Sequence, residues 1–273
     1  MAKDADKRLR FYAERFPVVE LDSSYYAIPD PAQAALWAER TPAGFTMNVK
    51  AFATITGHPA ETARLPRDLR ESLPAEIQAK RRLDPKDLPA DVLTEIHARF
   101  WIALRPLREA GKLGAVLLQL PEWVGPGRAA RDAIRRMREM LPDDRLAVEF
   151  RNAAWMAEGD RASTLAFLRE NGLTYVSVDG PQGFRSSMPP VAAVTDPELA
   201  IVRFHGRNTE SWKEPGLTAA QRFNYLYSRE ELGEWVPRVR DLAAEAKEVQ
   251  LLMNNCHGDQ AVRNAADFVD LLS

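Results

Sequence analysis

The chain has 273 residues, 45% hydrophobic and 28% charged, a composition that excludes a disordered protein and supplies the apolar side chains for a sizeable core. Its 37 Lys and Arg residues against 39 Asp and Glu residues give a net charge of −2, so no overall basic field exists to hold nucleic acid or an anionic membrane. The single cysteine, Cys256, excludes an intramolecular disulfide and fits a reducing compartment. The apolar runs are too short for a membrane helix, and the charged N-terminus lacks a signal segment. We therefore expect a cytoplasmic protein.

Short apolar segments alternate with helix-like segments along the chain. We expect strands at 18–23, 45–50, 115–120, 146–150, 174–179, 200–205 and 248–254, and helices at about 31–40, 92–110, 127–140, 160–171, 229–246 and 259–272. This alternation predicts a parallel sheet covered by helices. An open doubly wound sheet is the alternative, but no glycine-rich phosphate loop follows any strand.

We therefore predict an α/β fold, a TIM-type (β/α) barrel in one domain over residues 1–273. Such a barrel has eight strands, whereas this chain opens in a helix-like segment, KRLRFYAERF, ahead of the first visible strand. The first strand of the barrel is therefore expected to be missing.

The connection after the second visible strand is much longer than one crossover helix. Residues about 60–112 carry several prolines at expected helix starts and many charges, which predicts a helical insertion of two or three short helices. Leaving the carboxyl end of a strand, the insertion would lie over the top of the barrel as a partial lid. A solvated helical decoration without a role is the alternative.

Polar residues gather near the carboxyl ends of the predicted strands. Side chains two residues apart on a strand share a face, and four such polar pairs occur: Glu20 with Asp22, Asn48 with Lys50, Glu149 with Arg151, and Arg203 with His205. Three other strands end in single polar residues, Gln119, Asp179 and Asn255. Because unpaired buried charges are costly, this concentration predicts a barrel mouth, where barrel enzymes keep their active sites.

Each of these features also has a structural interpretation. Glu149 and Arg151 could form an internal salt bridge, and Lys50 could extend to solvent. His58 could lie near the mouth or pack within its turn. Trp155 could form a pocket wall or belong to the core.

Several collinear segments together resemble one family. They are FYAERFPVVELDSSYYAIP, TPAGFTMNVKAFATITGHP, LGAVLLQLPEW, LAVEFRNAAW, IVRFHGRN and LLMNNCHGDQAVRNA. From about residue 8 to the end, the chain resembles the DUF72 family, also called UPF0759 or YecE-like. The resemblance implies a TIM-type barrel with an unassigned activity, and analogy between folds links the family to metal-dependent nuclease barrels.

The resemblance also implies a set of recurring polar positions, which largely coincide with the predicted mouth. They fall on Glu20, Ser23, Tyr25, Lys50, His58, Gln119, Glu149, Arg151, Trp155, Asp179, Arg203, His205, Gly206, Arg207, Asn254 and Asn255. Members of the family usually open with a glycine-rich strand of the GTSGW kind, which this chain lacks. That departure suggests a late start codon or a truncated chain.

The mouth residues are of both signs with a slight cationic bias, which suits a phosphate or carboxylate. Our first hypothesis is an enzyme of hydrolase or lyase type that acts on a small anionic substrate without an organic cofactor or a metal. The expected catalytic residues are Glu149, His205, Glu20 and Asp179. The expected substrate-binding residues are Lys50, His58, Gln119, Arg151, Trp155, Arg203, Arg207, Asn208, Tyr25 and Asn255.

Two alternatives stay open. One is a metal-dependent phosphodiesterase or nuclease, with a divalent metal held by Glu20, Glu149, Asp179 and His205. Arg151 and Arg203 argue against it, because each shares a strand face with a proposed ligand. The other is a non-catalytic module that binds a metabolite or RNA, although the net charge disfavours broad contact with nucleic acid.

Overall fold

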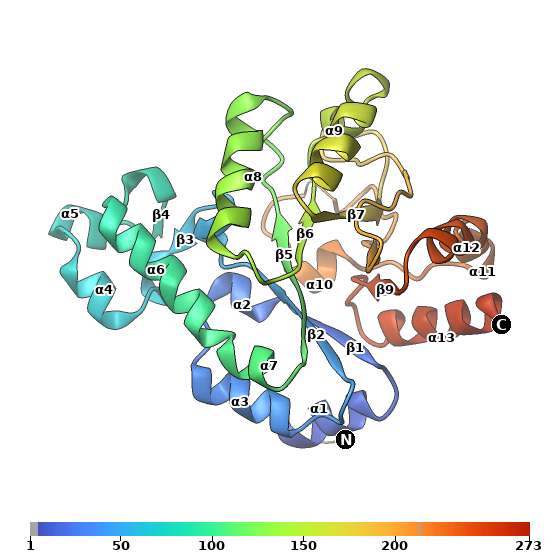
Figure 1. Ribbon diagram of the computed structural model, residues 1–273, viewed down its shortest axis with the longest axis horizontal. Coiled ribbons are helices and arrows are strands. Elements are labelled where there is room, and N and C mark those ends of the chain that lie inside the picture. Colours follow the sequence, from blue (N-terminus) through green and yellow to red (C-terminus); the bar gives the residue numbers. More distant parts are fainter. Residues whose placement is uncertain (1–4, 213) are drawn as a thin grey trace. The chain divides into compact units, whose positions relative to one another are not determined.

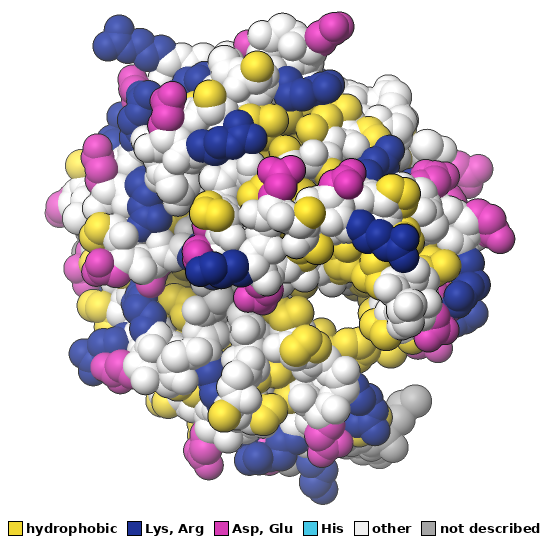
Figure 2. Space-filling model, turned by 45° about the vertical axis from the view of Figure 1, so that its right-hand side comes forward, with side chains coloured by type: hydrophobic (Ala, Val, Ile, Leu, Met, Phe, Trp, Pro, Cys, Tyr) yellow, Lys and Arg dark blue, Asp and Glu magenta, His cyan; other side chains and the backbone are white. Residues whose placement is uncertain are grey.

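The computed structural model describes residues 5–212 and 214–273, shown in Figure 1. The chain divides into two compact units, Met1–Leu120 and Pro121–Ser273. None of the helices in the described part of the chain is long and apolar enough to cross a membrane. Basic and acidic side chains are intermixed over the face seen in Figure 2, in line with the nearly balanced charge.

The first unit is built on three parallel strands in the order β1, β2, β5. Its elements outside the insertion are α1 (Ala5–Ala13), β1 (Val18–Leu21), α2 (Ser23–Tyr26), α3 (Pro31–Glu39), β2 (Thr46–Lys50), η1 (Ala53–Thr56) and β5 (Leu113–Gln119). Helix α3 begins where Asp30 accepts a hydrogen bond from the Ala32 N–H at 2.7 Å, with Pro31 at its first position. A helix, α1, precedes the first strand, as the sequence predicts.

The insertion after β2 is present and richer than predicted. It contains β3 (Ala60–Glu61), η2 (Thr62–Arg64), α4 (Arg67–Ser72), α5 (Ala75–Gln78), β4 (Arg82–Leu83), η3 (Pro85–Asp87), α6 (Ala90–Ala103) and α7 (Arg105–Glu109). Strands β3 and β4 pair antiparallel in a small second sheet that the sequence analysis missed. Helix α6 buries Ile96 and Phe100 completely, which fixes it to its own unit.

The second unit is built on four parallel strands in the order β6, β7, β8, β9. Its elements are α8 (Arg128–Met140), β6 (Leu146–Glu149), η4 (Ala153–Met156), α9 (Glu158–Glu170), β7 (Leu173–Asp179), β8 (Ala200–Phe204), α10 (Ala219–Arg222), α11 (Arg229–Gly233), α12 (Val236–Glu245), β9 (Val249–Met253) and α13 (Gln260–Leu272). All seven predicted strands therefore exist in the two units, with ends within two residues of those expected.

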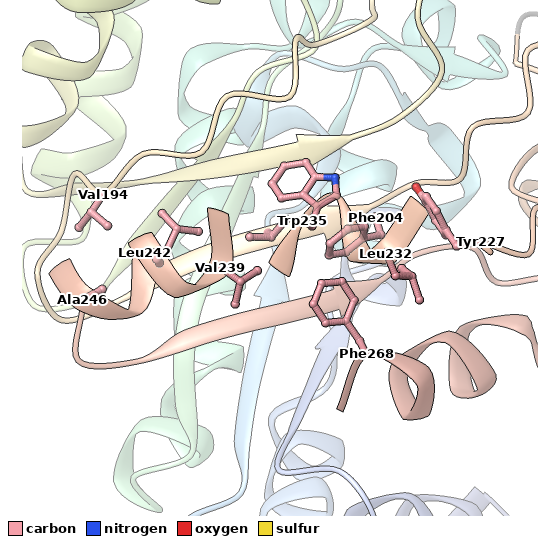
Figure 3. Packing of buried hydrophobic residues seen from close by; sticks show 11 residues of the cluster. Val194, Phe204, Tyr227, Leu232, Trp235, Val239, Leu242, Ala246 and Phe268 are labelled. Carbon is pink, nitrogen blue, oxygen red and sulfur yellow. The ribbon is translucent and has the colours of Figure 1, made fainter. Parts of the chain in front are cut away.

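One face of β8 forms a hydrophobic core with the helices that follow it (Figure 3). Phe204 is fully buried, with its ring centroid 5.4 Å from that of Trp235 on the α11–α12 side and 5.4 Å from that of Phe268 on α13. Alternate residues of a strand point to opposite faces. Arg203 and His205 therefore point away from this core, to the other face of the sheet.

Candidate functional site

The residues around Glu149 form a buried ionic cluster in the second unit. Glu149 ends β6, Arg203 is the last residue but one of β8, and His205 follows that strand directly. Glu149 Oε2 accepts a hydrogen bond from Arg203 Nη1. The other carboxylate oxygen, Oε1, lies 3.0 Å from His205 Nε2 and 3.1 Å from Arg151 Nη1. All four side chains therefore meet at one place, as the alternation of side chains along each strand predicts.

The members of this ionic cluster differ sharply in exposure. The side chains of Glu149, Arg203 and His205 are 0–1% exposed, whereas that of Arg151 is 17% exposed. A buried charge is tolerated only when it is paired and hydrogen-bonded. The paired Glu149 and Arg203 meet that condition, and Arg151 is the member that can still meet a ligand.

Burial and charge act in opposite directions on the two titratable members. Burial raises the pKa of the Glu149 carboxyl, but the charge of Arg203 and the contact with His205 outweigh it and hold that pKa well below its usual range. Burial lowers the pKa of His205 to about 4, although Glu149 opposes this shift. At neutral pH the cluster therefore consists of a carboxylate, two guanidiniums and a neutral imidazole.

Aromatic side chains from the loop after β8 cover the ionic cluster. The Arg151 guanidinium lies 5.0 Å from the centre of a Trp212 ring, a cation–π contact. The Phe223 ring lies 5.8 Å from both the His205 and the Trp212 rings. Trp212 is itself oriented by a 3.0 Å hydrogen bond from Nε1 to Ser186 Oγ. Trp212 therefore packs against Arg151, and Phe223 packs against both His205 and Trp212.

Asp179 lies on the opposite face of the sheet, and the structure does not bring it to Glu149. In the parallel register Val178 pairs with Arg203, whereas Asp179 pairs with Phe204 of the hydrophobic core. Its carboxylate accepts hydrogen bonds from Tyr227 at 2.7 Å and from the Trp235 indole at 2.7 Å.

Arg207 completes the polar network on that face. Its Nη2 donates to Asp179 at 2.8 Å and to Glu234 at 2.9 Å. The Tyr227 hydroxyl, which donates to Asp179, accepts the backbone N–H of Gly206 at 2.9 Å. Asp179 and Arg207 thus anchor the start of the loop that carries Trp212 and Phe223, a positioning role rather than direct contact with the ionic cluster.

Three other expected binding residues make structural contacts within the second unit. Asn208 Oδ1 accepts from the backbone N–H of Glu210 at 3.0 Å, inside the loop. Asn255 is fully buried, and its Nδ2 donates to the Tyr225 carbonyl at 2.9 Å. Trp155 is fully buried and stacked on Phe150 at 4.3 Å, which places it in the core rather than at a surface.

The remaining expected residues belong to the first unit. Glu20, Lys50 and Gln119 lie on its strands, whereas Tyr25 is in α2 and His58 follows η1. Glu20 pairs in register with Asn48, and Lys50 with Leu117, two residues before Gln119. Lys50 Nζ lies 3.7 Å from an Asp22 oxygen and 4.6 Å from the centre of the Tyr25 ring.

His58 extends this first-unit cluster. Its ring centroid lies 5.4 Å from that of Tyr25, and its Nδ1 is 2.9 Å from Thr56 Oγ1. Burial, with Tyr26 nearby, raises the pKa of Tyr25 to about 12, so the phenol is neutral at physiological pH and can donate a hydrogen bond. The lysine, the phenol and the imidazole form a second polar group, which lies within the first unit.

The metal alternative does not fit the residues present. Within residues 5–212 and 214–273, no three His, Cys, Asp or Glu side chains come together as a metal would require. Asp179 faces away from Glu149 and His205, and both Glu149 oxygens already accept hydrogen bonds from cationic or imidazole groups.

The sequence analysis missed two residues that contact the ionic cluster, Trp212 and Phe223, and it gave a third, Asn254, only as a recurring polar position that the family resemblance implies. Asn254 Nδ2 lies 2.8 Å from His205 Nδ1. The register of β8 and β9 pairs Arg203 with Leu252, and parity then puts Asn254, rather than Asn255, beside His205. Trp212 and Phe223 come from an irregular loop, where no periodicity reveals which side chains turn inward.

Comparison with solved structures defines the class of protein, a TIM-type (β/α) barrel. A DUF72 family protein from Enterococcus faecalis V583 matches with a TM-score of 0.79 and 28% identity, covering 97% of this chain and 93% of that one. A DUF72 family protein from Thermotoga maritima MSB8 matches with a TM-score of 0.75 and 30% identity, covering 99% and 91%. The fold predicted from the sequence is confirmed.

Sequence comparison gives the family. The family described as "Protein of unknown function DUF72" matches residues 1–273. The UPF0759 protein YunF of Bacillus subtilis (strain 168) is 31% identical over 271 residues, covering 98% of this chain and 87% of the relative. The chain belongs to the DUF72 family, as the collinear motifs indicate.

Proposed function

We propose that this protein binds a small phosphate- or carboxylate-bearing molecule at the Glu149 ionic cluster and acts on it as a hydrolase or lyase. The observation that carries the proposal is the pairing of one buried carboxylate with two guanidiniums, of which only Arg151 is partly exposed. The two guanidiniums exceed the single carboxylate by one positive charge. An anion at Arg151 would balance it.

The arrangement favours electrostatic stabilisation over proton transfer by Glu149. The Glu149 carboxylate is fully buried with its pKa well below the usual range, so it neither gives nor takes a proton near neutral pH. We therefore assign Glu149 the role of orienting Arg151 and Arg203. In hydrolysis or elimination, negative charge develops on the oxygen that leaves, and a preorganised guanidinium in a water-poor site stabilises such charge.

The first unit carries a separate group of expected binding residues. Lys50 is its cation, held between Asp22 and the Tyr25 ring, and a lysine so placed suits a phosphate or carboxylate. We propose that Lys50, with Tyr25 and His58 beside it, binds an anion within the first unit.

The test is a titration with inorganic phosphate and with acetate, monitored by calorimetry or NMR. Arg151→Met should weaken phosphate binding about 10- to 100-fold, because a hydrogen bond to a charged group contributes roughly 1.5–3 kcal/mol. Arg135→Met is the control, since Arg135 on α8 pairs with Asp132 at 2.8 Å, outside the ionic cluster. Equal affinity in wild type and Arg151→Met would refute the binding site.

A turnover screen with phosphate monoesters and carboxylate esters tests the catalytic half of the proposal. We expect turnover that Arg151→Met lowers and Arg135→Met does not. Anion binding without any turnover would instead support a non-catalytic metabolite-binding module. A steep fall in affinity for an RNA oligonucleotide with rising salt would support the RNA-binding alternative.

A further inference from the structure

His205 makes a hydrogen bond at each of its two ring nitrogens. Nε2 lies 3.0 Å from Glu149 Oε1, and Nδ1 lies 2.8 Å from Asn254 Nδ2. A carboxylate oxygen can only accept, and an amide nitrogen can only donate. The partners therefore match an imidazole that carries its proton on Nε2 and offers a lone pair at Nδ1.

We infer that Asn254 is a positioning residue that holds His205 as a neutral imidazole protonated on Nε2, with that N–H directed at Glu149. Asn254 follows β9, and the register that pairs Arg203 with Leu252 brings its side chain beside His205. The inference extends the proposed function, because it accounts for the single surplus positive charge of the anion site. The two hydrogen bonds of the ring are sufficient to assign the tautomer.

The surroundings of His205 favour the neutral ring. The groups that face it are Glu149 from β6, with Arg151 and Arg203 bonded to the same carboxylate, and the aromatic rings of Trp212 and Phe223. An imidazolium would be a third cation around one carboxylate, in a position only 1% exposed. A buried charge without its own counter-charge is strongly disfavoured. The lowered pKa of His205, caused mainly by burial, agrees with this.

The neutral ring also affects Arg151. Glu149 Oε1 accepts from both His205 Nε2 and Arg151 Nη1, so His205 occupies part of the acceptor capacity that would otherwise bind Arg151 alone. The hold of Glu149 on Arg151 is therefore weaker, and the Arg151 side chain is 17% exposed, so an anion can reach its guanidinium. A ring turned over at His205 would lose both hydrogen bonds and would leave Oε1 to Arg151 alone, which would bind that guanidinium more tightly and make it less available to an anion.

The inference is tested on the full chain by ¹⁵N NMR of the histidine side chains, of which there are four, with His205 assigned by its loss in His205→Gln. In the wild type, His205 should show the neutral Nε2–H pattern throughout pH 5 to 8. In Asn254→Asp, a carboxylate beside Nδ1 should convert the ring to the doubly protonated form at pH 7. In Asn254→Leu, loss of the donor should give a mixture of ring states.

The outcomes separate the inference from the proposed function. A doubly protonated or Nδ1–H ring in the wild type would overturn the inference, as would two folded variants whose His205 signals match the wild type. The same samples are titrated with inorganic phosphate, and Asn254→Leu should bind it about threefold to tenfold more weakly. A neutral Nε2–H ring in a protein that binds no phosphate would refute the proposed anion site and leave the tautomer assignment standing.

Discussion

The Arg203 side chain can be almost completely buried because the Glu149 carboxylate pairs with its guanidinium. Its guanidinium meets Glu149, and both side chains are 0–1% exposed. Burying such a pair costs desolvation of both ions, so the pair contributes little net stability, whereas loss of one partner leaves an uncompensated charge.

We therefore expect Arg203→Met to destabilise the fold by about 3–5 kcal/mol, the usual effect of removing one partner of a buried ion pair. The double variant Glu149→Met/Arg203→Met should lose less than this, because no lone charge remains. Denaturant unfolding of the single and double variants measures both effects. A single variant as stable as the wild type would show that Arg203 is not a structural partner of Glu149.

Individual residues also show where sequence reasoning reaches its limit. Alternation within a strand correctly paired Glu149 with Arg151 and Arg203 with His205. It could not show which face of each strand turns toward which neighbour, because that depends on register between strands. For this reason Asp179 was grouped with Glu149, although its register partner is Phe204 of the hydrophobic core.

At the scale of elements, the loop after β8 begins with a turn that only glycine permits. Gly206 has φ +82°, and a Cβ added there would lie 2.7 Å from the Tyr225 Cβ. Tyr225 is in turn held by its backbone, which bonds to Gln260 and Asn255. The loop that carries Trp212 and Phe223 is thus fixed by backbone geometry at its start.

Gly206→Ala should destabilise the protein by about 1–3 kcal/mol and weaken anion binding, since strain and overpacking combine at this position. Gly216→Ala is a matched control, because Gly216 has φ +81° but its added Cβ would meet no atom of the described residues within 4 Å apart from its two chain neighbours. The difference between their unfolding free energies isolates the contact with Tyr225. Equal losses in the two variants would contradict the packing argument.

A buried lysine, Lys112, stabilises the segment that follows α3. Lys112 is buried just before β5, and its Nζ donates to the Thr41 carbonyl at 2.6 Å and to Thr41 Oγ1 at 3.0 Å. These acceptors follow the carboxyl end of α3, where carbonyl groups lack partners within the helix.

Lys112→Met should cost about 1–3 kcal/mol, because buried carbonyl groups lose their donor while the apolar stem is kept. Hydrogen exchange should quicken at the end of α3 before it does elsewhere in the first unit. The exposed Lys86, paired with Asp84 at 3.2 Å, provides the control variant Lys86→Met. Unchanged stability in Lys112→Met would mean that water replaces the ammonium group without penalty.

For the whole molecule, hydrophobic periodicity was sufficient to predict the barrel class, because parallel strands with helical crossovers leave a strong pattern in the sequence. The small β3–β4 sheet was missed because a strand of two residues, such as Ala60–Glu61, is too short to show any period. The sequence predicted only those residues of the candidate site that lie on strands or directly after them. Its aromatic cover comes from a loop, whose conformation depends on tertiary contacts such as that between Arg207 and Asp179.

Buried neutral histidines should make the stability of the molecule depend on pH in acid. Burial lowers the pKa of both His97, on α6, and His205 to about 4, whereas the unfolded chain takes up these protons near pH 6.5. As the pH falls from about 6.5 to about 4, the unfolded state therefore binds protons that the folded state does not, and the free energy of unfolding decreases. It should be nearly constant between pH 7 and 8, since neither histidine titrates there.

His97 offers the cleaner test, because its Nε2 has no hydrogen-bond partner among the described residues. His97→Leu should leave stability at pH 7 unchanged or higher and should reduce the loss between pH 6.5 and 4.5 by about 1–3 kcal/mol, the linkage expected from its lowered pKa. The residual acid sensitivity then belongs to groups that include His205. Urea unfolding at pH 7 and pH 4.5 measures the difference, and an identical pH dependence in wild type and variant would show that His97 is protonated in the folded protein as readily as in the unfolded chain.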